Sequence, residues 1–381
     1  MDQDLLDQLV AWRRALHRMP EPSGAEECTA RFVAEILARH GIAFETGIGG
    51  HGIVATLERG TGGRSVSLRA DMDALPIVEA NDTAYVSQNP GFMHACGHDG
   101  HTVALLGSIL TLNDDPRWDG TIHFLFQPAE ENGVGAKAMI ADGLFGRFPM
   151  ERIFAFHNWP GLEAGTVAVH DGPVMAAGGG WTMTLRGLAG HAATPHKTRD
   201  PIVAAGHLIV ALQSIVSRSI DPSAAAVLSI GTIQGGTASN QIPAEVRLTG
   251  TLRTYDPAVR QTIIAAMERI GNGIAASFDM AIDIDIRSTG RAVDNTPAEV
   301  DLAVAAAHAA GLPVRRDLPP SGAGDDFSFL VAERPGAYVW IGNGGTGAED
   351  GLHNDRYDFN DAVLPAAVQW MSSVARLALA R

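Results

Sequence analysis

Cysteine is scarce in this chain, since its 381 residues include only Cys28 and Cys96. Two cysteines cannot form a disulfide framework, and they exclude zinc sites built from four thiolates. Positive charge is also in the minority, because 28 Lys and Arg stand against 43 Asp and Glu and give a formal net charge of −15. This excess of negative charge argues against nucleic acids and anionic membrane surfaces as partners.

Long uninterrupted apolar segments are missing as well. The longest runs, such as PIVAAGHLIVALQSIV, are broken by residues such as His207 and Gln213, and we expect them to fall short of a membrane span. The amino-terminal segment is charged throughout and lacks the apolar core of a signal peptide. We therefore expect no membrane association and a cytoplasmic location.

The length of the chain exceeds what one hydrophobic core usually supports, so we expect two domains. Between residues 52 and 158, short apolar strands such as GIVATLE alternate with helical segments such as HTVALLGSILTL. This alternation predicts an α/β fold with a central, largely parallel sheet. We expect this domain to be discontinuous and to comprise residues 1–179 and 291–381.

The segment between those two parts has a different pattern. Its predicted elements follow the order strand, helix, strand, strand, helix, strand, from WTMTLRG at 181–187 to AIDIDIRST at 281–289. This is the order of a small α+β, ferredoxin-like domain. Residues 180–290 are therefore predicted to form an inserted domain.

Polar residues recur where the predicted strands of the first domain end. Asp71 and Asp73 follow one strand, Glu130 and Glu131 follow a second, and His157 follows a third. Loops beyond the carboxyl ends of strands are where α/β sheets place their functional sites. Their recurrence at several strand ends predicts one site at this edge of the sheet.

Cys96 and His98 are separated only by Gly97 within GFMHACGHDGHT. An extended or turned segment can direct both side chains at one ion, and the glycine relieves crowding between them. A mixed set of Cys, His and carboxylate ligands suits Zn²⁺, Mn²⁺ or Ni²⁺ in an open catalytic site. The same residues also allow a thiol hydrolase, with Cys96 as nucleophile and His98 or His101 as its base.

The adjacent acids Glu130 and Glu131 have two interpretations. An arbitrary pair of glutamates is usually a solvated surface feature. This pair, however, follows an apolar strand and Pro128 and precedes a glycine-rich loop. We therefore expect one carboxylate to bind metal while the other acts as a base toward a water molecule.

Eight motifs occur in the order found in one known family. The chain resembles the amidohydrolase branch of the dinuclear-metal aminoacylase/carboxypeptidase metallopeptidase family, which includes hippurate hydrolase and the auxin-conjugate hydrolases. The resemblance covers nearly the whole chain. The motifs are RADMDALPI, MHACGHDGHT, QPAEE, AFHNWPG, GHAATPH, SNQIPAEVRLTGTLRTYD, DDFSFL and LHNDRYDFND.

The resemblance implies roles for particular residues. Glu130 matches the general base, and Asp73 matches the acid that orients a ligand or the base. In the inserted domain, His191 matches a histidine that reaches the neighbouring subunit's site, and Asn240 matches a residue that contacts substrate. Two divalent metal ions per subunit are implied, bound by Cys96, His98, Glu131, His157 and His353.

The implied activity is metal-dependent hydrolysis of the amide bond of N-acyl amino acids, which are small molecules. Glu130 would act as the base toward the attacking water. Alternatives within the family are a metallo-dipeptidase and an N-acetyl-diaminopimelate deacetylase. A protein that binds or senses metal without catalysis is a further alternative. The inserted domain is implied to be a lid that forms a homodimer, and a tetramer made of two dimers stays open.

Several positions keep open roles at this stage. His94 and His101 flank the metal loop as candidate partners of the ligands, and His196 is a candidate for substrate contact or for capping its loop. Asp71 stands where other branches carry a metal-binding histidine, although it could simply pair with Arg69. Asp325 and Asp355 depart from the common family pattern, and we expect both near the mouth of the site, where they would affect substrate choice.

Overall fold

The computed structural model describes residues 1–288, 290–345, 347 and 351–380. Within it the chain divides into two compact units. The first contains Met1–Val174, Val293–Pro320 and Asp325–Arg381, and the second contains Met175–Ala292 and Ser321–Gly324. The units thus differ from the predicted domains, because 175–179, 291–292 and 321–324 belong to the second unit.

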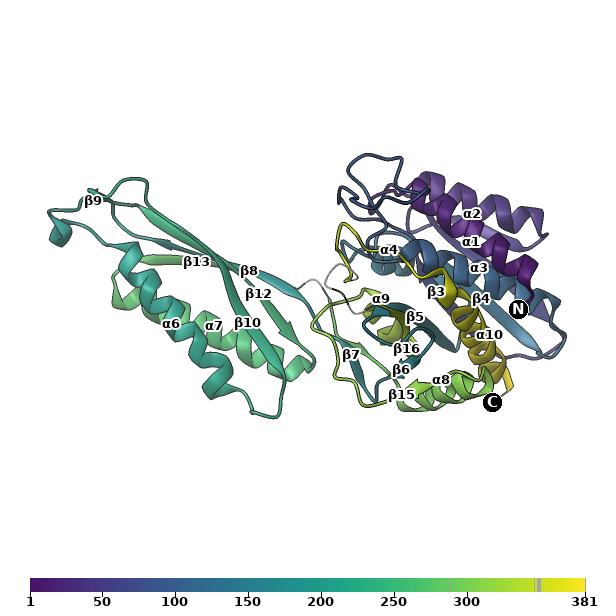
Figure 1. Cartoon of the computed structure of the whole chain (residues 1–381). Coiled ribbons are helices and arrows are strands. Elements are labelled where there is room, and N and C mark those ends of the chain that lie inside the picture. Colours follow the sequence, from purple (N-terminus) through teal and green to yellow (C-terminus); the bar gives the residue numbers. More distant parts are fainter. Residues whose placement is uncertain (289, 346, 348–350, 381) are drawn as a thin grey trace. The chain divides into compact units, whose positions relative to one another are not determined.

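The first unit is built on an eight-stranded mixed sheet with the order β1-β2-β4-β3-β5-β16-β6-β15 (Figure 1). Its centre is parallel, since β4 pairs with β3, β3 with β5 and β5 with β16 in that direction. At one edge β2 is antiparallel to both β1 and β4, and at the other β6 is antiparallel to β16 but parallel to β15. The strands are β1 Ala43–Ile48, β2 Gly52–Arg59, β3 Ser65–Asp71, β4 Gly120–Gln127, β5 Arg152–Pro160, β6 Val167–Val169, β15 Val314–Arg315 and β16 Gly336–Gly344.

Helices cover this sheet, and their ends follow local rules. α1 begins after Asp2, whose side chain accepts a hydrogen bond from the Leu5 amide at 2.8 Å, and it ends shortly before Pro20. Strands β7 Pro173–Met175 and β14 Val293–Asp294 pair to form a separate two-stranded sheet. The helices of this unit are α1 Gln3–Arg18, α2 Glu27–Arg39, α3 His98–Asp114, α4 Gly135–Ala141, α5 Leu144–Arg147, α8 Pro297–Ala309, α9 Phe327–Glu333, the 3₁₀ turn η3 Asp361–Val363 and α10 Leu364–Ala380.

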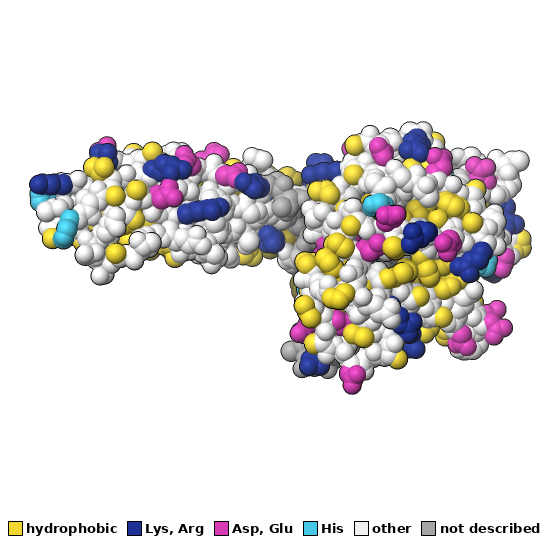
Figure 2. Space-filling view, turned by 90° about the horizontal axis from the view of Figure 1, so that it is seen from above, with side chains coloured by type: hydrophobic (Ala, Val, Ile, Leu, Met, Phe, Trp, Pro, Cys, Tyr) yellow, Lys and Arg dark blue, Asp and Glu magenta, His cyan; other side chains and the backbone are white. Residues whose placement is uncertain are grey.

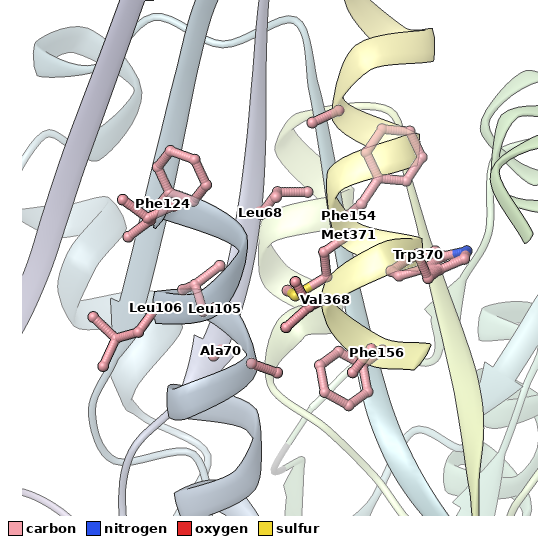
Figure 3. Close-up of a cluster of buried hydrophobic side chains, with 14 of the residues drawn as sticks. Leu68, Ala70, Leu105, Leu106, Phe124, Phe154, Phe156, Val368, Trp370 and Met371 are labelled. Atoms are coloured by element: carbon pink, nitrogen blue, oxygen red, sulfur yellow. The ribbon is translucent and has the colours of Figure 1, made fainter. Parts of the chain in front are cut away.

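The main core lies where α3 and α10 pack against the parallel strands (Figure 3). α3 is apolar on nearly all sides because it also packs against α1 and is therefore enclosed. This enclosure makes the first turn of α3 a rigid platform. Figure 3 labels Leu68, Ala70, Leu105, Leu106, Phe124, Phe154, Phe156, Val368, Trp370 and Met371 in this core.

The second unit has the predicted β-α-β-β-α-β order and forms a separate four-stranded antiparallel sheet, β10-β12-β8-β13. Both helices begin with an aspartate cap followed by proline, at Asp200 and Asp256. Thr289, predicted to end the last strand, lies outside the described residues. The elements are β8 Gly179–Arg186, β9 Gly190–His191, the 3₁₀ turn η1 Pro195–Lys197, α6 Pro201–Ser219, β10 Ala226–Gln234, β11 Gln241–Ile242, β12 Glu245–Thr254, α7 Pro257–Ser277 and β13 Ala281–Ser288.

Among the described residues, two helical segments are long and apolar enough to cross a membrane by length and composition alone, Pro201–Ser219 and Asp361–Ala380. The expectation that the apolar runs are too short was therefore wrong on these criteria. In the second segment 72% of the apolar window is buried inside the protein, as in a core helix, against 28% in α6. Two such helices are weak support for a membrane span.

On the face drawn in Figure 2, basic and acidic side chains are interspersed over both units. The negative net charge is thus spread over many sites on this face.

Candidate metal centre

Strands β3, β4 and β5 lie side by side in the sheet (Figure 1), and several predicted site residues lie at or just beyond their carboxyl ends. Asp71 is the last residue of β3, Gln127 is the last residue of β4, and His157 lies near the end of β5. Because these strands are parallel neighbours, the loops that follow them meet.

The segment from Cys96 to His98 reaches these strand ends at the start of α3. The helix begins at His98, three residues earlier than the apolar pattern predicts, and Gly97 precedes it with a φ of 90°. A Cβ atom at Gly97 would lie 2.4 Å from the side-chain oxygen of Asn158. Only glycine fits this backbone, and it places Cys96 and His98 on either side of the turn.

Five overlapping groups of possible donor atoms occur here among the described residues, and three of them together contain the predicted metal ligands. Within each group, one ligand atom from every residue lies within 4.8 Å of the others. The Cys96 sulfur is 3.4 Å from His157 Nε2, and Glu131 Oε1 is 3.4 Å from His353 Nε2. These three groups are Cys96, His98 and His157; Cys96, Glu131 and His353; and His98, Glu130 and Glu131.

The five predicted metal ligands are therefore brought together, and Cys96 belongs to two of the groups. His98 and Glu131 likewise belong to two of these three groups, so the groups share donors at one site. His353 is held in the left-handed region with a φ of 61°, which a residue other than glycine adopts only where its surroundings impose it. Its amide donates to the Ala95 carbonyl at 2.8 Å, which ties His353 to the loop before Cys96.

Two of these donor atoms are buried without a hydrogen bond. Within the described part of the chain, neither His98 Nε2 nor Glu131 Oε1 has a hydrogen-bond partner. Buried polar atoms are normally satisfied, so such atoms at the centre of a donor cluster are what a cation site requires.

The charge of the site favours cations as well. Burial lowers the pKa of His98, but Asp71 and Asp73 outweigh it and raise that pKa to about 10. Burial and the nearby carboxylate of Glu131 raise the pKa of the Cys96 thiol. The negative potential thus stabilises positive charge, and the mixed S, N and O donors fit a borderline-soft divalent metal.

Asp73 contacts the backbone or the side chain of two predicted ligands. Its Oδ1 lies 3.3 Å from His98 Nδ1, and its Oδ2 accepts from the Glu131 amide at 2.9 Å. The Asp73 carbonyl is 2.9 Å from the same His98 nitrogen. Asp73 is therefore placed to orient the His98 ring and the backbone of Glu131.

Glu130 belongs to the donor group with His98 and Glu131, and it also faces acids outside that group. It forms a further acidic cluster with Asp325 and Asp326, and its Oε1 accepts from the Asp326 amide at 3.3 Å. Burial and these two carboxylates raise the pKa of Glu130. Such a shift makes a carboxylate a better proton acceptor near neutral pH.

Arg69 balances part of this negative charge. It is buried and lies 2.7 Å from Asp71, 3.2 Å from Asp325 and 3.3 Å from Asp326. Asp325 also accepts a hydrogen bond from the Tyr338 hydroxyl at 2.6 Å and is only 6% exposed. The expectation that Asp325 lies at the mouth was therefore wrong, because its carboxylate is needed to pair with a buried guanidinium; Asp355 is exposed.

The two histidines that flank the metal loop differ. His101 Nδ1 is 2.6 Å from Asp71, and its Nε2 is 2.6 Å from the Asn158 oxygen. Asp71 thus contacts both Arg69 and His101, and it also forms a donor group with His98 and His101. His94 is 1% exposed, and its ring nitrogens have no hydrogen-bond partner in the part of the chain described.

The remaining predicted residues belong to the second unit. His191 of β9 pairs with Gln241 of β11, and the Ala192 amide donates to the Asn240 carbonyl at 3.0 Å. His191 and Asn240 are thus close to each other and both exposed. His196 is exposed in η1.

Sequence reasoning named Arg69 as a possible partner of Asp71, and the structure confirms this pair at 2.7 Å. It missed several other residues around the site. Asp326 stands inside a quoted motif, but its contact with Arg69 joins residues 257 apart in the chain. Asn158 stands beside His157 in the quoted motif AFHNWPG, whereas Tyr338 lies on β16, where nothing in the local pattern distinguishes it from core residues.

Comparison with known proteins agrees with this geometry. The family model described as Peptidase family M20/M25/M40 matches residues 67–377. A hippurate hydrolase from Campylobacter jejuni is 37% identical over 374 residues, which covers 98% of this chain and 97% of that protein. An N-acetyl-L-cysteine deacetylase from Bacillus subtilis is also 37% identical, over 97% of this chain and 88% of its own length.

A further relative, an N-acyl-L-amino acid amidohydrolase from Geobacillus stearothermophilus, is 42% identical over 73% of this chain and 76% of its own. Among solved structures, a Bacillus subtilis protein described as a dinuclear metal binding peptidase from the M20 family superposes with a TM-score of 0.88. It is 31% identical and is covered over 99% of its length, against 100% of this chain.

The α/β unit with its inserted ferredoxin-like unit, and the donors gathered at the strand ends, define a metal-dependent hydrolase. The chain belongs to peptidase family M20/M25/M40, and within it to the amidohydrolase branch. It is therefore a metal-dependent amidohydrolase, as the resemblance implied.

Proposed function

We propose that this enzyme hydrolyses the amide bond of N-acyl amino acids, with Glu130 as the general base. The observation that carries the proposal is the position of Glu130, whose carboxylate lies at the donor group of His98 and Glu131 and also faces Asp325 and Asp326. Relatives named for hippurate and for N-acyl-L-amino acids support the substrate class.

Two divalent ions, of zinc, manganese or nickel, would be held by Cys96, His98, Glu131, His157 and His353. When bound, such ions polarise a carbonyl oxygen and lower the pKa of water. Their positive charge would offset the negative potential of the site.

The protein's own residues move the proton and hold the geometry. Glu130 accepts a proton from the attacking water and returns it to the nitrogen of the leaving amine. Asp73 holds the His98 ring and the Glu131 backbone through the contacts at 3.3 and 2.9 Å. Arg69 keeps Asp325 and Asp326 in place beside the base.

His191 and Asn240 would act from the second unit. We propose that this unit is a lid that forms a two-fold homodimer, so that His191 supplies a hydrogen-bond donor to the carbonyl oxygen in the partner's site. Asn240 would contact substrate beside it. A cytoplasmic location and the absence of nucleic-acid and membrane partners remain proposals from the sequence.

A thiol hydrolase is less well supported. Burial and the neighbouring carboxylates raise the pKa of the Cys96 thiol, which disfavours the thiolate that a nucleophilic cysteine needs. A sensing protein is disfavoured too, because binding alone does not require a base at Glu130. An N-acetyldiaminopimelate deacetylase stays the second candidate, since such a relative from Enterococcus faecalis is 34% identical over 96% of both chains.

The test is a panel of acetyl-, benzoyl-, long-acyl and indole-acetyl amino acids, with N-acetyl-diaminopimelate and dipeptides included, measured with Zn²⁺, Mn²⁺ or Ni²⁺ supplied. We expect the enzyme to hydrolyse at least one N-acyl amino acid faster than it hydrolyses the dipeptides. Turnover of dipeptides alone would contradict the proposal.

A further inference from the structure

The segment Pro22–Glu26, between α1 and α2, contacts the site although no role has been assigned to it so far. Pro22 pairs with Ala74 in an isolated parallel bridge. The Ser23 hydroxyl donates to Asp73 Oδ2 at 2.6 Å. We call Pro22–Glu26 the brace, because it meets the chain directly beside Asp73.

Glu26 is the buried end of the brace. Its side chain is fully enclosed, and its Oε1 accepts from the amides of Gly24 and Ala129, each at 2.8 Å. Its Oε2 is buried, and in the described structure this atom has no hydrogen-bond partner. Burying a carboxyl group costs free energy. The hydrogen bonds from the Gly24 and Ala129 amides offset this cost.

Ala129, the residue before the base, has an unusual backbone. Its φ is 53°, in the left-handed region that alanine rarely adopts. Its carbonyl accepts from the Gly135 amide at 3.1 Å, and a Cβ atom at Gly135 would lie 1.6 Å from the Pro128 carbonyl oxygen. The turn from Pro128 to Gly135 is therefore tight.

The amides on both sides of Glu130 donate to buried carboxylates. The Ala129 amide donates to Glu26, and the Glu131 amide donates to Asp73. The brace touches both acceptors, since Ser23 donates to Asp73 and Glu26 is its last residue. The brace thus holds the backbone beside the base directly through Glu26 and indirectly through Asp73, to which Ser23 donates.

We propose that Glu26 is a positioning residue, which fixes Glu130 by accepting a hydrogen bond from the Ala129 amide. This inference rests on the proposed role of Glu130 as the base. Misplacing a reacting group by about 1 Å can cost about a hundredfold in rate. Glu26 should therefore affect kcat much more than KM or metal content.

Three substitutions at Glu26 separate the effect of side-chain length from the effect of charge. Glu26→Gln keeps the length and an acceptor oxygen, so we expect kcat within about threefold of wild type. Glu26→Asp keeps the charge but is shorter by one methylene, and Glu26→Ala removes the acceptor. For both of these we expect kcat to fall about 10- to 100-fold with KM nearly unchanged.

Glu299 gives a matched control. It is 3% exposed, its Oε1 is 3.2 Å from Arg152 Nε, and its Oε2 is likewise buried without a partner among the residues described. Glu299→Ala should lower the melting temperature but leave kcat per folded chain within about twofold, because Glu299 does not contact the turn.

Two readouts do not depend on turnover. Amide hydrogen exchange over residues 128–135 should speed up in Glu26→Asp and Glu26→Ala but not in Glu26→Gln. The absorption spectrum of the Co²⁺-substituted protein should stay unchanged in all three variants, because the metal ligands are not displaced.

The proposal is overturned if Glu26→Asp keeps full kcat while Glu26→Gln loses it, because charge would then matter and reach would not. It is also overturned if amide exchange at Ala129 is no faster in Glu26→Asp and Glu26→Ala than in wild type. The same holds if added metal restores the activity that these two variants lose. Wild-type protein that hydrolyses no N-acyl amino acid would instead reject the proposed function, while the exchange experiment would still test the brace.

Discussion

At the scale of single residues, Glu130 and Glu131 are chain neighbours in different surroundings. Both belong to the donor group with His98, but Glu131 Oε1 also lies 3.4 Å from His353 Nε2, whereas the carboxylate of Glu130 also lies with those of Asp325 and Asp326. The sequence could predict that both acids lie at the site, because both follow the end of a buried strand, and their separate roles stay predictions. It could not predict the pairing of Arg69 with Asp325, since that contact joins residues 256 apart.

Exchanging each acid for its amide should separate their roles. Glu130→Gln keeps the size of the side chain but removes the proton acceptor, so kcat should fall about 10²- to 10⁴-fold while both metals remain bound. Glu131→Gln should mainly lower metal affinity. Metal analysis alongside steady-state kinetics checks this, and loss of metal from the first variant alone would invert the two assignments.

Cys96 tests whether the sulfur is a ligand. Cys96→Ser replaces a soft thiolate by a hydroxyl, so metal affinity and activity should fall together, and excess metal should partly restore the activity. Cys28→Ser is the control, because Cys28 belongs to none of the donor groups found among the described residues. Full metal occupancy and unchanged activity in Cys96→Ser would reject the ligand role.

At the scale of elements, buried contacts of His17 tie α1 to Asp99 in the first turn of α3 and to Glu79 in a loop. His17 Nδ1 is 2.8 Å from Asp99 and its Nε2 is 3.1 Å from Glu79. Helices α1 and α2 could be predicted from a strong apolar periodicity, whereas α3 and α8 are apolar with little periodicity and could be predicted only from the length of their apolar segments. The short strands β6, β7, β14 and β15 could not, because two or three residues show no periodicity.

These ion pairs predict a pH dependence of stability. Burial lowers the pKa of His17, but hydrogen bonds to Asp99 and Glu79 outweigh it and raise the pKa to about 9. Since this is above the ordinary value of about 6.5, protonated His17 stabilises the folded state fully below about pH 6.5, and the contribution is lost as pH rises through about 9. The contribution is on the order of 3 kcal/mol.

Urea unfolding at pH 6 and pH 9.5 measures this effect at constant metal content. His17→Gln should be destabilised at pH 6 and should lose much of the decline seen in wild type between the two pH values. The exposed His308 gives a control, because His308→Gln should behave as wild type. An equal decline in wild type and His17→Gln would contradict the assignment.

At the scale of the whole molecule, the chain places its donor groups in one unit and His191 in the other. The inserted unit could be predicted from the order of its elements, which matches the structure. Its limits were missed by a few residues, because the connecting segments at 175–179 and 321–324 contact each other through Ala176, whose amide lies near the Ser321 and Ala323 carbonyls. Such contacts leave no trace in a local pattern.

A mixing experiment tests the proposed exchange of His191 between subunits. Glu130→Gln and His191→Ala should each be nearly inactive. The first lacks the proposed base, and the second lacks an oxyanion donor, which contributes about 10²- to 10³-fold to kcat. After complete subunit exchange of equal amounts, half the dimers are mixed and each has one complete site, so roughly a quarter of wild-type activity should return. Verified mixed dimers without regained activity would show that His191 does not serve the partner's site.

The central claim is that bound divalent ions and Glu130 together hydrolyse N-acyl amino acids. The most direct measurement is a metal titration of chelator-treated protein, with the initial rate of hydrolysis followed for the best N-acyl amino acid of the panel. The rate should be negligible at the start, rise with added metal and level off at two ions per chain in wild type. Glu130→Gln should take up the same two ions without gaining the rate. Full activity in metal-free wild type, or a wild-type rate in metal-loaded Glu130→Gln, would contradict the account.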